Sequence, residues 1–264
     1  MSLTKEALQH LSEQDCTGTS IEDGRGLILG DHFKVEDMER FQDERWRFRG
    51  KFVTESVASF THYVGPRAQP ALPVFIDRER MSARCYIDIG NEGMPGHCDH
   101  SATLTLPKTP EFKAFEKANG ASLSQDDLVE LIEDWGHLLT FANSAGEVLE
   151  RGKVLSAVRK ISIDDLTQQE SDRQDYSGQT SVMNSVKVNN ADRLPATITW
   201  RLNPYEGLNE RELTMRMSIL TKGPAFRLRA VSLEAVEQDI AREFAYLIEA
   251  ALEDCDCLVG TFSP

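Results

Sequence analysis

Apolar and polar residues alternate with a period of two in three short segments near the end of the chain, residues 196–202, 213–219 and 226–230. This period is typical of strands in an antiparallel sheet that buries one face. The positions assigned to the buried face are Ala196, Ile198, Trp200, Leu202, Leu213, Met215, Met217, Ile219, Phe226, Leu228 and Ala230. We therefore expect a three-stranded antiparallel sheet with a continuous apolar face.

A long amphipathic helix is predicted directly after this sheet. Its apolar residues recur every three or four positions, and Ser232 stands where an N-cap residue is expected. The apolar positions are Leu233, Val236, Ile240, Phe244, Leu247 and Ala251. Since a helix and a sheet hide each other's apolar surface, we expect the helix to lie across the apolar face of the sheet, in one contiguous core.

The rest of the chain mixes strand and helix patterns. Within residues 45–52, Trp46, Phe48 and Phe52 alternate with arginine and lysine, which predicts a strand with a buried aromatic face and a cationic outer face. Further strands are expected at 74–76, 84–89 and 101–106, and helix starts at Thr54, Thr109, Ser124 and Ser144. The predicted fold class is α+β, with antiparallel β-sheets packed against amphipathic helices.

Three parts follow one another along the chain. Residues 1–20 are expected to form a flexible N-terminal arm, residues 21–163 an N-terminal α+β half, and residues 164–264 a C-terminal half with the sheet and the long helix. A polar stretch, residues 164–179, separates the two halves. The two halves can equally form one continuous domain.

The composition is typical of a soluble globular protein. The formal net charge is −14, with 43 acidic residues, and this excess works against non-specific binding to nucleic acid. No run approaches the roughly 18 uninterrupted apolar residues that a membrane span needs. The N-terminus lacks the basic start and apolar centre of a signal peptide, and the five cysteines are irregularly spaced. We expect free thiols and a cytoplasmic location.

No segment carries a recognisable catalytic or cofactor motif. Residues 97–100 (His-Cys-Asp-His) combine three ligand types, but neighbouring residues in a strand point to opposite faces, and no second ligand pair with zinc spacing occurs. Cys255 and Cys257 are separated by one residue, whereas thioredoxin-like motifs have two. We expect no metal, no cofactor and no catalytic residue, so the chain is predicted not to be an enzyme.

Arginines gather on the predicted outer faces of the strands. They are Arg45, Arg47 and Arg49 in the first half, and Arg201, Arg216, Arg227 and Arg229, among threonines and serines, in the second. With Lys222 and Gly223 as the turn, Arg216 lies directly opposite Arg229, which is unfavourable for like charges. We expect an acidic group over them: a carboxylate of another element, an acidic face of a neighbouring subunit, or a phosphate. The acidic excess of the chain favours the first two.

Several short blocks of the chain occur in an order that is typical of one family. They are residues 47–54 (RFRGKFVT), 100–106 (HSATLTL) followed by Thr109 and Pro110, the helix 130–135, 194–196 (LPA), 205–207 (YEG) and 260–262 (GTF). In these blocks the chain resembles the YfdQ-like proteins of bacteriophages and prophages, over residues 20–264, with the N-terminal arm outside. The resemblance implies a phage protein in the cytoplasm of a bacterial host. It supplies no catalytic residues, because this family is a domain of unknown function.

Two functions fit these observations. The first is a non-enzymatic phage accessory protein that self-assembles into a homo-oligomer, with its cationic faces docked on acidic surfaces of neighbouring subunits. The second is a module that binds nucleic acid or a nucleotide, in phage recombination or in countering host defence. In that case Trp46 or Phe48 would stack on bases if exposed, although their alternation predicts that they are buried.

Overall fold

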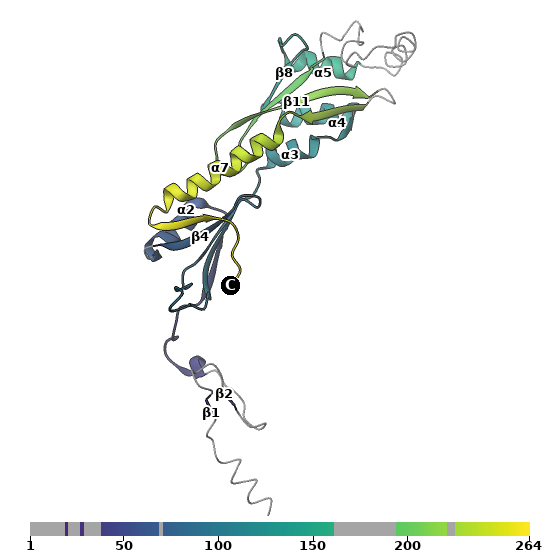
Figure 1. Ribbon diagram of the computed structural model, residues 1–264. Helices are drawn as coiled ribbons and strands as arrows, with labels where there is room; N and C mark the ends of the chain where they lie inside the picture. The colour runs from purple at the N-terminus through teal and green to yellow at the C-terminus, as the bar shows by residue number, and fades with distance from the viewer. Residues whose placement is uncertain (1–18, 21–26, 29–37, 69–70, 161–193, 221–224) are drawn as a thin grey trace, which may run out of the picture. The chain divides into compact units, whose positions relative to one another are not determined.

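A computed structural model describes residues 19–20, 27–28, 38–68, 71–160, 194–220 and 225–264, and the chain divides into two compact units, Met1–Phe48 and Arg49–Pro264 (Figure 1). In the smaller unit, β1 (Thr19–Ser20) pairs with β2 (Leu27–Ile28) in antiparallel orientation, and a 3-10 helix, η2, spans Met38–Phe41. All other described helices and strands belong to the larger unit, whose two sheets are both wholly or mostly antiparallel. The predicted α+β class is confirmed.

The first sheet of the larger unit has six antiparallel strands in the order β7-β12-β11-β10-β8-β9. Its strands are β7 (Ser122–Ser124), β8 (Leu139–Ala142), β9 (Val148–Leu149), β10 (Thr197–Leu202), β11 (Arg211–Leu220) and β12 (Ala225–Ala230). The period of two seen in the sequence is the burial period of β10, β11 and β12: Ile198, Trp200, Met215, Phe226 and Leu228 are all fully buried. The three-stranded sheet expected from the sequence is therefore confirmed, and it forms the centre of a larger sheet.

Three helices cover the apolar face of this sheet. They are α3 (Pro110–Ala118), α4 (Gln125–Trp135) and α5 (Arg151–Arg159), which pack against β10, β12 and β8 respectively. Two of the predicted N-caps are confirmed: the Thr109 hydroxyl accepts from the Phe112 amide, and Ser124 with Asp127 forms a capping box. The helix start expected at Thr54 is wrong by two residues, since the cap of the following helix is Ser56, whose hydroxyl accepts from the Ser59 amide. Local capping residues therefore fix where α3 and α4 begin.

The second sheet has five strands in the order β13-β4-β5-β6-β3. Its strands are β3 (Gly50–Thr54), β4 (Leu72–Asp77), β5 (Ser82–Tyr86), β6 (His100–Thr105) and β13 (Cys255–Val259). β4, β5 and β6 are antiparallel neighbours, while β3 and β13 are parallel to their partners. After β13 the chain returns over the outer face of this sheet, where Phe262 stacks on Phe75 with 4.9 Å between ring centroids.

The long helix α7 (Leu233–Ala251) forms as predicted but packs in a different place. It contacts β13 and α2 (Val57–Val64), and Figure 1 shows it reaching from the neighbourhood of α3 to that of α2. The expectation that it covers the apolar face of the three C-terminal strands is wrong, because α3, α4 and α5 already cover that face. Ile240 and Phe244 are buried in the same continuous core as Trp200, while Leu247 is only half-buried.

Two local expectations are also wrong. Residues 45–52 do not form one strand: β3 begins at Gly50, and the backbone amide of Trp46 donates to the Glu39 carboxylate (2.9 Å), which turns this segment back toward η2. No helix begins at Ser144, because the Asn143 side chain accepts from the amides of Ala145 and Glu147 and closes a turn between β8 and β9.

Strands from both sides of residue 164 meet in each sheet. In the six-stranded sheet β8 pairs with β10 and β7 with β12, and in the five-stranded sheet β13 pairs with β4. The two halves defined along the sequence therefore share both sheets and one core. Of the expected N-terminal arm, only Thr19 and Ser20 are described, and the predicted flexibility of residues 1–18 lies outside the described residues.

Thr109 joins α3 to the loop after β10 and should be needed for stability. Its buried hydroxyl donates to the Asn203 carbonyl (2.6 Å) while it caps the helix. We predict that Thr109→Ala lowers the free energy of unfolding by about 1–3 kcal/mol, since a cap is lost and a buried carbonyl is left unpaired. Urea denaturation measures this change, and Thr105→Ala, an exposed threonine of β6, is the control. Equal destabilisation by the two substitutions would contradict the assignment.

Candidate interaction face

The face of the six-stranded sheet that points away from the helices is polar. Its side chains are Ser122, Ser124, Thr140, Thr197, Thr199, Arg201, Glu212, Thr214, Arg216, Ser218, Arg227 and Arg229. We call it the arginine face, after Arg201, Arg216, Arg227 and Arg229. Strand pleating places these side chains together, because the residues between them are the buried apolar ones.

The register of the strands brings the arginines close to one another. Arg216 lies directly opposite Arg229, as predicted, and Arg227 lies between Ser218 and Ser122. Directly opposed side chains have their Cβ atoms about 5 Å apart, and residues two apart along a strand are separated by about 7 Å. The guanidinium groups of Arg216, Arg227 and Arg229 thus extend from one small area of the sheet.

The arginines of this face differ in their partners. Arg201 forms an ion pair with Glu210, and the hydrogen bond to that carboxylate raises the pKa of Arg201. Arg216, Arg227 and Arg229 are exposed, and none of them forms an ion pair with a carboxylate of the described residues. Opposed arginines without a counter-ion repel each other, and the expectation that an acidic group covers them is not met by any carboxylate of the described residues. That this group comes from outside the chain stays a prediction.

None of the three arginines predicted in the first half belongs to a strand of the six-stranded sheet. Arg49 directly precedes β3 of the five-stranded sheet, within ion-pair distance of Asp99 (3.8 Å). Arg45 and Arg47 belong to the smaller unit, in a segment of bends. The single cationic strand that the sequence pattern suggested is therefore absent from the described structure, because the extended backbone it needs starts only at Gly50.

Two aromatic residues of the same segment are exposed. Trp46 is 70% and Phe48 64% exposed, so the prediction that they are buried is wrong. Phe52, the third predicted inward residue, packs against the core and stacks on Tyr63 with 4.4 Å between ring centroids. Alternation alone does not distinguish a strand from a polar segment that contains two aromatic residues.

Residues 97–100 form a structural cluster. His100 is buried, with its Nε2 atom 3.0 Å from the Tyr63 hydroxyl, and burial lowers its pKa. The Asp88 carboxylate accepts from the backbone amides of Asp99 and His100 (3.0 and 2.9 Å), which anchors the loop before β6. Among the residues that the structure describes, no group of three or more His, Cys, Asp or Glu side chains is arranged to hold a metal ion.

Three cysteines lie on the covered face of the five-stranded sheet. Cys257 and Cys85 are both register partners of Val74, on opposite sides of β4, and Cys255 precedes Cys257 by two residues. Burial raises the pKa of Cys85 to about 12 and that of Cys257 to about 11. These thiols therefore stay protonated near neutral pH, which is typical of structural cysteines and not of nucleophilic ones.

An acidic ridge runs along α4, on the helix side of the six-stranded sheet. Asp126, Glu130 and Asp134 follow one another at four-residue intervals and are exposed, and α4 contains no lysine or arginine. In the described part of the chain none of the three forms an ion pair, whereas their neighbour Glu133 is paired with Arg159. Residues four apart on a helix lie above one another, so these three carboxylates form a single line on the helix surface.

Comparison with known families finds one family whose model covers nearly the whole chain. Residues 4–262 match the model of a family described as an uncharacterized conserved protein (DUF2303). The chain belongs to the DUF2303 family. The family match includes residues 4–20, so the expectation that the N-terminal arm lies outside the family region is wrong for them. No curated protein and no solved structure matches this DUF2303 chain. No described helix is both long enough and apolar enough to span a membrane.

Because the Cys85 thiol is buried, we predict that the folded protein loses stability at alkaline pH. Above pH 9.0, the ordinary pKa of a cysteine, the unfolded chain releases the thiol proton while the folded chain keeps it up to about pH 12 at Cys85. The stability contributed by this thiol is complete below pH 9 and falls as pH rises, by at most about 1.4 kcal/mol per unit.

Cys85→Ala should therefore flatten the dependence of the free energy of unfolding on pH between 8 and 10, as measured by urea denaturation. The substitution also leaves a small cavity, which lowers the free energy of unfolding at every pH. The quantity to compare is therefore the slope of this free energy against pH. Cys98→Ala, at a much less buried position, is the control and should leave the slope closer to that of the wild type. An unchanged slope in Cys85→Ala would show that this thiol is not protected in the folded state.

Proposed function

We propose that the protein is a non-enzymatic accessory protein of bacteriophages or prophages that self-assembles into a homo-oligomer through its arginine face. The phage setting, in the cytoplasm of a bacterial host, rests on the resemblance to YfdQ-like proteins. The observation that supports assembly is the opposition of Arg216 and Arg229, both exposed and without a carboxylate partner among the described residues.

A second copy of the chain carries a suitable partner for this face. On the acidic ridge of α4, successive carboxylates are about 6 Å apart along the helix axis. Arg227 and Arg229 are about 7 Å apart along β12. The two surfaces therefore match in spacing as well as in sign, and a guanidinium group that meets a carboxylate forms a charge-assisted hydrogen bond.

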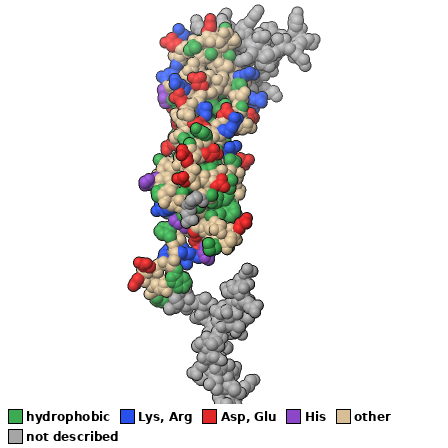
Figure 2. All heavy atoms as spheres, turned by 60° about the vertical axis from the view of Figure 1, so that its left-hand side comes forward, with side chains coloured by type: hydrophobic (Ala, Val, Ile, Leu, Met, Phe, Trp, Pro, Cys, Tyr) green, Lys and Arg blue, Asp and Glu red, His purple; other side chains and the backbone are tan. Residues whose placement is uncertain are grey.

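The abundance of acidic side chains also favours a protein partner of the same kind. The formal net charge of −14 leaves many carboxylates without a basic neighbour, and Figure 2 shows acidic and basic side chains interspersed over one face of the protein. Charged faces of opposite sign on one chain guide identical copies toward each other and set their register. Neutralising the opposed arginines would remove a repulsion that is present in the isolated chain.

This contact would be heterologous. The arginine face and the α4 ridge lie on opposite sides of the same sheet, so each copy would present one surface to a copy above it and the other surface to a copy below. Head-to-tail contacts of this kind produce closed rings or open filaments, depending on the rotation between successive copies. A dimer with a two-fold axis does not satisfy both surfaces.

Nucleic acid is the second candidate partner, and the exposure of Trp46 and Phe48 is the observation that favours it. Exposed aromatic rings stack on unpaired bases, and a sheet with guanidinium and hydroxyl groups binds phosphates. The net charge of −14 opposes this binding at long range, so it should require low salt. We therefore place it after self-assembly.

Charge reversal on the arginine face provides the test. Arg216→Glu should shift the particle toward monomer in size-exclusion chromatography with light scattering, because it sets a carboxylate against the acidic ridge of the next copy. Combining Arg216→Glu with Glu130→Lys in the same chain should restore assembly. Arg80→Glu, an exposed arginine in the turn between β4 and β5, is the matched control and should assemble normally.

A wild-type protein that is strictly monomeric at micromolar concentration would contradict self-assembly. If the monomer instead binds single-stranded DNA at low salt, and Arg216→Glu and Trp46→Ala each weaken that binding, the second candidate is supported. Assembly of Arg216→Glu to the same extent as the control would show that the contact lies elsewhere.

A further inference from the structure

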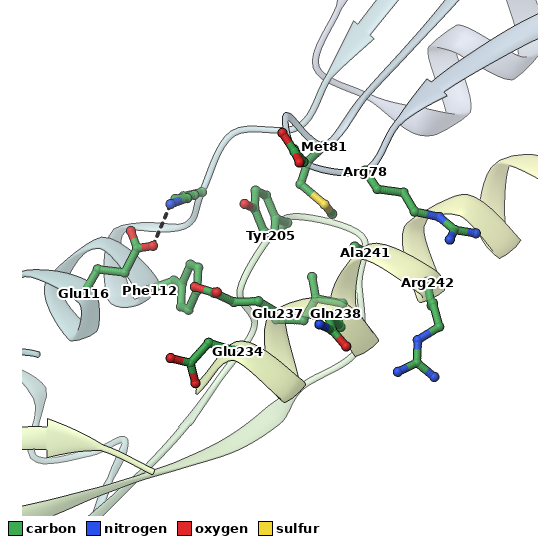
Figure 3. A pocket seen from close by; sticks show the side chains of 13 residues that line it. Arg78, Met81, Phe112, Glu116, Tyr205, Glu234, Glu237, Gln238, Ala241 and Arg242 are labelled. Carbon is green, nitrogen blue, oxygen red and sulfur yellow. Dashed lines mark hydrogen bonds and ion pairs between the residues drawn. The ribbon is translucent and has the colours of Figure 1, made fainter. Parts of the chain in front are cut away.

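The larger unit contains a pocket that lies away from the arginine face. Its volume is about 640 Å³, and it is lined by the turn after β4, the start of α3, the loop after β10 and the first half of α7 (Figure 3). These segments are far apart in the sequence and meet only in the folded chain. No function considered so far uses this pocket.

The floor of the pocket is apolar and rigid. Met81, Phe112 and Ile240 are almost fully buried and belong to the continuous core. Phe112 packs against Tyr205 with 6.0 Å between ring centroids, so the two rings form one aromatic wall. A ligand that enters would therefore meet a fixed surface of carbon atoms rather than mobile side chains.

Tyr205 provides a polar group that the fold does not use. Only 8% of this residue is exposed, and its hydroxyl forms no hydrogen bond with any described residue. Figure 3 shows the hydroxyl pointing toward the end of the pocket where Glu116, Phe112 and Glu237 lie. The hydroxyl oxygen is not among the buried unpaired atoms of the described residues, so it reaches the pocket and can form a hydrogen bond with a ligand there.

Carboxylates surround the hydroxyl. Glu116 is occupied by the Lys108 ammonium group (2.6 Å), while Glu234 and Glu237 form no ion pair within the described residues. Figure 3 shows both extending from α7 toward Phe112, whereas the Arg78 and Arg242 side chains extend from the opposite end. The end of the pocket that contains Tyr205 therefore has an excess of negative charge beside an aromatic ring.

We propose that this pocket binds a small organic cation, an alkyl ammonium group, whose charge lies between Glu234, Glu237 and the Tyr205 hydroxyl. The ammonium group donates to the carboxylates and to the phenolic oxygen, and the alkyl body packs on Phe112 and Met81. The Lys108 ammonium already lies over the Phe112 ring, 5.6 Å from its centroid, so this ring offers the ligand packing and not a further cation–π contact. The same chemistry is present in a free amine and in a lysine side chain of a partner protein, and both would fill the pocket in this way.

Binding can be followed without knowing the natural ligand. In NMR titrations of the full chain, with methionine methyl groups labelled, n-butylammonium should shift the Met81 resonance saturably at about 150 mM salt, where diffuse attraction is screened. n-Butanol has the same shape without the charge and should leave the resonance unchanged. N-acetyl-lysinamide tests the protein side chain: if it binds more tightly than n-butylammonium, the source is a lysine, and the reverse order indicates a free amine.

Variants test the named residues. Glu237→Gln should weaken n-butylammonium binding about tenfold, and Tyr205→Phe several-fold, because each removes a hydrogen-bond acceptor but keeps the packing. Glu249→Gln, an exposed carboxylate on the same helix, is the matched control and should bind as the wild type does. The proposal is overturned if neither amine shifts Met81, if n-butanol shifts it equally, or if Glu237→Gln binds unchanged. None of these readouts depends on assembly through the arginine face, so the two proposals can fail separately.

Discussion

The opposition of Arg216 and Arg229 across two central strands is the constraint on which the account of this protein depends. The register that places these arginines side by side is fixed by burial on the other face, where Met217 is paired with Leu228 and Met215 with Ile198. A shift by one residue would relieve the repulsion only by exposing the core. The chain therefore keeps an unfavourable pair of charges on its surface, and in the proposed assembly an acidic partner would offset their repulsion.

A single core supports both sheets. The strands β10, β11 and β12 bury their apolar residues under α3, α4 and α5, and α7 continues the same core to the five-stranded sheet. The side chains below the arginine face and below the pocket both belong to this core.

Much of this arrangement could be predicted from local patterns. The period of two gave the buried faces of the C-terminal strands and the register of Arg216, and cap residues gave the starts of α3 and α4. The position of α7 could not be predicted, because an apolar stripe requires a cover but does not identify it, and three other helices already cover the nearest sheet. Trp46 and Phe48 were assigned to a core because they alternate with charged residues, but this alternation does not show that any element covers them. The pocket could not be predicted from the sequence, since Met81, Phe112, Tyr205 and Glu237 come together only through long-range packing.

The central claim is that an acidic surface of a second copy covers the arginine face, and side-chain protection measures this most directly. Arginines can be modified with phenylglyoxal in dilute and in concentrated protein, and the extent at each site can be read by mass spectrometry. The account predicts that Arg216, Arg227 and Arg229 become protected as concentration rises, while Arg80 reacts equally at all concentrations. Equal reaction of Arg216, Arg227 and Arg229 in dilute and in concentrated protein would contradict it.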